Sequence, residues 1–144
     1  MTLTSLFSND EIIFAYTRAD AISDGVLVEL SDQMVNEAGI KVKVAVTRAV
    51  WDDYLVPPYL DELPGQSIEG RTWDLLWMFG CAARRSRHAS TIQFRVLFVT
   101  MKESECCDRQ DPVNTVTEDV LLKAVCGPGD EGEPVITIML PWED

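Results

Sequence analysis

Residues 67–101 read "SIEGRTWDLLWMFGCAARRSRHASTIQFRVLFVTM", and their hydrophobic period changes part-way through. The first part, 68–85, predicts a helix with Ser67 as its cap, because apolar residues recur every three or four positions. So many of its residues are apolar that we expect a central core helix, buried on most sides. Its apolar stripe consists of Trp73, Leu76, Trp77, Gly80 and Ala83.

From Thr91 onward the apolar period is two, which predicts a half-buried strand over 91–101. The face that we expect to be buried consists of Ile92, Phe94, Val96, Phe98 and Thr100. Two further β-rich runs follow, 116–126 and 134–140. Three consecutive strands predict an antiparallel meander packed on the central helix.

The N-terminal half alternates short helices with short strands. Thr17, Ser31 and Thr47 stand where helix caps are expected, and Gly25 and Gly39 stand where two of the helices should end. The expected strands are the β-branched runs 26–30 and 40–46. In the second of these, the side expected to be buried is Ile40, Val42, Val44 and Val46.

The length of 144 residues is enough for one domain with its own core. We therefore expect a single α+β domain over 1–144. An antiparallel sheet, ending in the three-stranded meander, should pack on the helix 68–85 and on the short N-terminal helices.

Gly127, Gly129 and Gly132 form G-x-G-x-x-G, the spacing of a dinucleotide-binding loop. In such a loop a helix follows, and its N-terminus meets the phosphates. Here Pro134 leads into a strand instead, and three carboxylates within 130–133 would face the phosphates. The pattern therefore predicts an acidic hairpin tip and no nucleotide cofactor.

Residues for catalysis or metal binding are sparse. The chain holds one histidine, His88, and four cysteines, none spaced as C-x-x-C. Cys106 and Cys107 stand among acids, which disfavour the reactive thiolate. The carboxylate pairs 52–53 and 61–62 are compatible with acid–base chemistry, although a solvated helix end and a loop explain them more simply. We therefore assign no catalytic residue, no metal site and no cofactor.

The net charge of −12, from 24 acidic and 12 basic residues, is the strongest global signal. A field of that sign repels nucleic acid and anionic membranes and attracts basic protein surfaces. We therefore expect a protein partner with a basic surface, and no direct contact with nucleic acid or membrane. Acids in the predicted loops and the C-terminal indole form the candidate partner-binding set. Its members are Asp61, Glu62, Glu103, Glu105, Asp108, Asp111, Asp130, Glu131, Glu133 and Trp142.

The sequence also favours a location. No apolar run approaches the roughly 20 residues of a membrane span. The first residues show no basic leader before an apolar block, so export is not expected. We expect the protein in the cytoplasm of a bacterial host cell, with its thiols free.

Four stretches carry a resemblance to a known family. They are "IFAYTRADAISDGVLVELSD" (13–32), "IKVKVAVTRAVWDDY" (40–54), "GRTWDLLWMF" (70–79) and "LKAVCGPGDEGEPVITIMLPWED" (122–144). They resemble a family of small uncharacterised acidic proteins encoded on conjugative plasmids, integrative elements and phages. That family has no established activity and no catalytic residues to carry over. The resemblance implies an accessory gene of a mobile element, among which inhibitors of host defence, anti-CRISPR proteins included, are frequent.

Three hypotheses follow. The first is an anti-CRISPR-like inhibitor that binds a host effector, a CRISPR effector complex in particular, through acidic loops that imitate nucleic acid. The second is a small enzyme that modifies a host factor or a nucleotide signal, with Tyr16, Thr17 and Arg18 around a pocket, although Arg18 is read more simply as an exposed residue at a helix start. The third is a non-catalytic accessory protein of the element, which as a homodimer would use Trp142 and an open strand edge. We favour the first.

Overall fold

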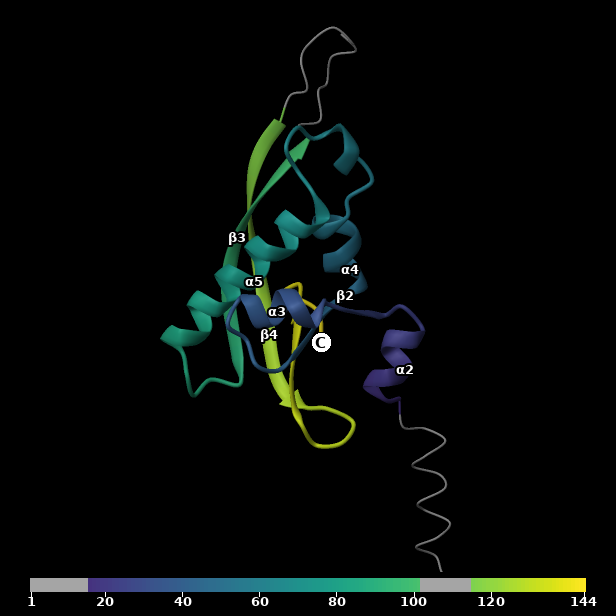
Figure 1. Cartoon of the computed structure of the whole chain (residues 1–144), viewed down its shortest axis with the longest axis vertical. Coiled ribbons are helices and arrows are strands. Elements are labelled where there is room, and N and C mark those ends of the chain that lie inside the picture. The colour runs from purple at the N-terminus through teal and green to yellow at the C-terminus, as the bar shows by residue number, and fades with distance from the viewer. Residues whose placement is uncertain (1–15, 102–114) are drawn as a thin grey trace, which may run out of the picture.

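The computed structural model describes residues 16–101 and 115–144. Along the chain, short elements come first and the long helix and strands follow (Figure 1). The helices are α2 (Arg18–Ser23), α3 (Asp32–Glu37), α4 (Arg48–Val50), the π-helical turn η1 (Trp51–Leu55), the 3-10 turn η2 (Leu60–Glu62) and α5 (Ile68–Arg85). The strands are β1 (Leu27–Glu29), β2 (Lys43–Thr47), β3 (Thr91–Met101), β4 (Thr115–Pro128) and β5 (Pro134–Met139).

The strands form one five-stranded sheet in the order β1-β2-β5-β4-β3. The meander is confirmed, because β3 pairs antiparallel with β4 and β4 pairs antiparallel with β5. The sheet as a whole is mixed, however, since β2 lies parallel to β5. Two parallel neighbouring strands need a long crossover connection. Here the connection from β2 to β5 runs from α4 to β4 and includes α5, so the hydrophobic period of a single segment does not reveal this pairing. The fold is α+β with a central helix, as the sequence predicts.

Strand β2 differs from the sequence prediction in its start and in its burial. Val44, Ala45 and Val46 are all buried, so both faces of this inner strand are covered. Ile40 belongs to the end of α3 instead, where its N–H donates to the carbonyl of Val35 at 3.1 Å. Gly39, at φ +84°, makes that reversal possible, as predicted.

Helix α5 packs against β3 with one face only. The residues buried on that face are Arg71, Thr72, Leu75, Leu76, Phe79 and Gly80. The predicted stripe is wrong at Trp77, which is 46% exposed, and Met78 beside it is 41% exposed. Both faces of α5 are apolar, so the helical period alone could not select the inner one.

The pair β3–β4 forms a long ribbon behind α5 (Figure 1). Phe94, Val96, Phe98 and Thr100 of β3 are buried and Ile92 is half-buried, which confirms the predicted face. Strand β4 has 14 residues and therefore spans about 40 Å at roughly 3.3 Å per residue. Its first residue follows the segment 102–114, and its last leads into the β4–β5 turn.

Candidate functional site

The β4–β5 turn contains the glycine pattern, and it is the hairpin tip that the sequence predicts. Gly129 N–H donates to the carbonyl of Glu133 at 2.6 Å, and Gly132 has φ +82°. Strand β5 begins at Pro134, so no helix N-terminus follows the glycines. The turn therefore lacks the helix that would hold a pyrophosphate.

Asp130, in this turn, caps helix α2. Its carboxylate accepts hydrogen bonds from the backbone N–H of Arg18 at 2.8 Å and of Ala19 at 3.0 Å. These two bonds lower the pKa of Asp130, because they favour its charged form. Asp130 thus joins two distant segments, a role that the sequence does not reveal.

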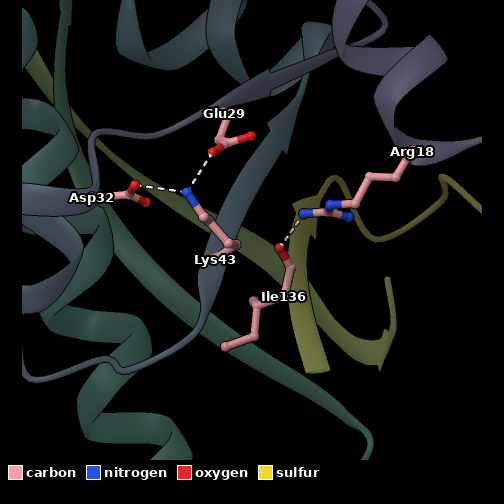
Figure 2. A network of polar contacts seen from close by, with 5 residues as sticks. All are labelled: Arg18, Glu29, Asp32, Lys43 and Ile136. Carbon is pink, nitrogen blue, oxygen red and sulfur yellow. Dashed lines mark hydrogen bonds and ion pairs between the residues drawn. The ribbon is translucent and has the colours of Figure 1, made fainter. Parts of the chain in front are cut away.

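The side chain of Arg18 also connects α2 to the sheet. Its guanidinium reaches across β5 and donates to Thr137 Oγ1 at 2.6 Å and to the carbonyl of Ile136 at 2.9 Å. Figure 2 shows the side chain directed at Ile136. The pKa of Arg18 is lowered, and burial is the main cause. The expectation of an exposed residue is therefore wrong, and Arg18 fastens α2 to the sheet.

A second polar cluster lies near Arg18 in Figure 2. Lys43 of β2 forms ion pairs with Glu29 at 3.3 Å and with Asp32 at 2.6 Å. All three side chains are well exposed, so the cluster does not form a buried site. Its ion pairs link β1, α3 and β2 locally.

Four exposed carboxylates lie on elements near the end of the ribbon where β3 finishes and β4 starts (Figure 1). Asp61 and Glu62 lie on η2, Asp53 on η1 and Glu118 near the start of β4. The pKa of Tyr54 is raised mainly by burial, and the nearby charges of Glu118 and Asp53 raise it further. Within residues 16–101 and 115–144, none of the four forms an ion pair. We call Asp53, Asp61, Glu62 and Glu118 the acidic end.

The predicted partner-binding residues do not share one surface. Glu131 and Glu133 lie at the opposite end of β4 from Asp61 and Glu62, about 40 Å away. Trp142, which is 76% exposed, lies in a C-terminal turn after β5. That turn is held where Thr47 Oγ1 donates to Glu143 at 2.7 Å. The remaining candidates lie outside the described residues, and they are Glu103, Glu105, Asp108 and Asp111.

Arg71 supports the acidic end from inside and was missed by the sequence analysis. It is 1% exposed, and its guanidinium lies 4.9 Å from the centre of the Phe98 ring. Nε donates to the carbonyl of Tyr54 at 2.7 Å, and Nη1 donates to Gln66 at 3.1 Å. Burial lowers its pKa. A basic residue in the first turn of an apolar helix gives no sign of this role.

A cavity of about 600 Å³ lies between α2, the ends of β1 and β2, and the C-terminal turn. Tyr16 lines it and donates its hydroxyl proton to Asp24 at 2.8 Å, while Arg48 lines it from α4. Thr17 and Arg18 do not line it, because Thr17 caps α2 and Arg18 lies against β5. No three potential metal ligands come together in the part of the chain that the structure describes.

Comparison with known proteins places the chain in a family. A model described as a family of unknown function (DUF6573) matches residues 3–144. The chain belongs to that family. The match covers the acidic end, the hairpin tip and the C-terminal turn, so all of these are parts of the family's domain. No curated protein and no solved structure matches the chain. Among the helices within the described ranges, none has the length and apolar character that crossing a bilayer requires.

Proposed function

We propose that this protein is a non-catalytic inhibitor, encoded by a mobile genetic element, which blocks a nucleic-acid-handling effector of the host's defence. The acidic end occupies the basic surface of the effector in place of nucleic acid. The partner class that the resemblance to mobile-element proteins implies is a CRISPR effector complex, whose channel holds a nucleic-acid backbone by its phosphates. The net charge of −12 suits such a basic surface.

The observation that supports the proposal is the set of four exposed carboxylates at the acidic end, none of which forms an ion pair with residues 16–101 or 115–144. Asp61 and Glu62 stand on a short turn fixed by the buried Leu60 and Leu63. Carboxylates on a backbone held in this way can accept charge-assisted hydrogen bonds from Lys and Arg with little loss of backbone entropy.

A competition experiment tests the proposal. Purified CRISPR effector complexes are mixed with labelled target DNA and increasing amounts of the protein, at roughly 50 to 500 mM salt. We expect stoichiometric loss of DNA binding that weakens as salt rises. Glu62→Lys with Glu118→Lys should weaken inhibition on the order of 100-fold, since reversed charges repel the basic surface.

Glu131→Lys with Glu133→Lys is the matched control, because it makes the same change in net charge at the far end of the ribbon. Inhibition should survive in this variant. Equal weakening by both pairs would show that net charge alone acts, and no inhibition of any effector would refute the proposal.

One observation favours the alternative, a small enzyme acting on a host factor or a nucleotide signal. The cavity lined by Tyr16 and Arg48 is large enough for a small ligand. A ligand there should raise the melting temperature of the wild type but not that of an Arg48→Met variant. Catalysis would show as turnover beyond one equivalent of protein, which a stoichiometric inhibitor does not give.

A further inference from the structure

Strand β3 is one of the two edge strands of the sheet, and within residues 16–101 and 115–144 no strand pairs with its outer edge. Ser90 turns its carbonyl toward β4, where it accepts from Cys126 N–H at 2.8 Å, and the ladder continues from there in steps of two residues. Because the direction alternates along an antiparallel strand, Gln93, Arg95 and Leu97 turn their N–H and C=O groups away from β4. Val99, next in the series, turns its carbonyl to Arg71.

A groove runs along this open edge between β3 and α5. It consists of two adjoining cavities, of about 330 and about 500 Å³, which share Met78 and Arg95 as lining residues. Together they extend from Ile92 to Leu97, which is about 17 Å, or the length of five extended residues. The groove therefore has the size of one short strand.

The middle of the groove is apolar and its wall is fixed. On the α5 wall between the two ends, Trp77 is 46% exposed and Met78 is 41% exposed, and Leu97 at one end is 62% exposed. The Trp77 ring stacks on Trp73 with 6.1 Å between ring centres, and the Arg84 guanidinium lies 5.8 Å from the Trp77 ring. Exposed aromatic and apolar side chains held in place like this are typical of a binding surface for an apolar anchor residue.

The two ends of the groove carry opposite charge. At the end near Leu97 Asp119 pairs with Arg95 at 3.4 Å, so Asp74 gives that end its negative charge, and Arg85 lines the end near Ile92. A strand that adds antiparallel to β3 has its N-terminus at the end lined by Asp74 and its C-terminus at the end lined by Arg85. Residues two apart point to the same side of a strand, so a charged, an apolar and an oppositely charged residue can all face α5.

We propose that this groove binds an extended peptide segment of a partner protein by strand addition to β3. The segment has the pattern basic-x-apolar-x-acidic from its N- to its C-terminus. The C-terminal half of α5 projects past the ribbon in Figure 1, where a second copy would have to place its own α5. A single segment therefore fits this edge better than another copy does. The inference does not depend on the function proposed for the acidic end.

The test uses a capped Lys-Thr-Leu-Thr-Glu peptide and the full-length protein. Amide chemical shifts should change at β3 and at the C-terminal half of α5, and they should remain unchanged in the β4–β5 turn. The reversed peptide, Glu-Thr-Leu-Thr-Lys, should bind at least about 10-fold more weakly, because both of its end charges are repelled.

Two variants separate edge pairing from charge. Leu97→Pro removes one outward N–H without touching the β4 ladder, so the fold should survive while peptide binding falls about 10-fold or more. Asp74→Lys with Arg85→Glu exchanges the end charges and should reverse the preference between the two peptides.

Three outcomes would overturn the inference. They are no binding of either peptide, equal binding of both by the wild type, and a wild-type dimer in light scattering that Leu97→Pro converts to a monomer. The last would assign the edge to a second copy.

Discussion

The Arg71 guanidinium donates from Nη1 to the carbonyl of Val99 at 2.8 Å, across 28 positions of the chain. Its Nε reaches the carbonyl of Tyr54 as well, so one side chain joins α5, β3 and η1. Tyr54 in turn stacks on Phe98, with 5.5 Å between ring centres. Asp53 and Glu118 lie close enough to Tyr54 to raise its pKa. Because Arg71 holds the carbonyl of Tyr54, this buried cation supports the acidic end from inside the fold.

Replacing Arg71 should therefore destabilise the whole fold. Arg71→Met keeps much of the side-chain volume but leaves the carbonyls of Tyr54 and Val99 without a donor. We expect the free energy of unfolding to fall by about 2–4 kcal/mol, measured by urea denaturation. Arg48→Met is the control, since the ion pair of Arg48 with Asp52 is exposed, and its effect should stay within about 0.5 kcal/mol. Equal effects of both changes would contradict the role assigned to Arg71.

Much of the fold was predictable because its signals are local. Caps and glycine stops depend on a few neighbouring residues, and the alternation in β3 depends on one strand. The parallel pairing of β2 with β5 and the bonds of Asp130 to α2 join residues far apart in the sequence, so no local period reveals them. The same limit applies to the candidate site. Loop acids are visible in the sequence, but their separation to the two ends of β4 follows from strand register.

Two serines that both precede helices should differ in importance. Ser67 Oγ accepts from Gly70 N–H at 3.0 Å, whereas the side chain of Ser31 makes no capping bond to α3. Ser67→Ala should lower the free energy of unfolding by about 1 kcal/mol, and Ser31→Ala by much less. Denaturation of the two variants side by side measures the difference. Equal losses would show that the hydroxyl bond at Ser67 contributes nothing.

Gly129 and Gly132 of the β4–β5 turn should differ in how much stability is lost on substitution by alanine. Gly132 has φ +82° and open space around it, so Gly132→Ala costs backbone strain alone, about 1–2 kcal/mol. A Cβ at Gly129 would meet only the movable carboxylate of Glu133, so Gly129→Ala should cost less. Thermal melts of both variants check this order. The reverse order, or a melting temperature raised by a dinucleotide, would favour a phosphate-binding loop instead.

The cap that Asp130 gives to α2 should make stability depend on pH. In the folded protein the pKa of Asp130 lies below its unfolded value of about 3.9, because hydrogen bonds from the backbone N–H groups of Ala19 and Arg18 favour the charged carboxylate. The stabilisation is therefore complete above that unfolded value and is lost as the pH falls through the folded pKa. Asp130→Asn should lower the urea midpoint at pH 7, and its difference from the wild type should shrink as the pH drops below about 4. Glu131→Gln, at the neighbouring exposed position, should change neither the midpoint nor its pH dependence. A gap between Asp130→Asn and the wild type that stays constant down to the acid transition would mean that charge on Asp130 does not hold α2 against the sheet.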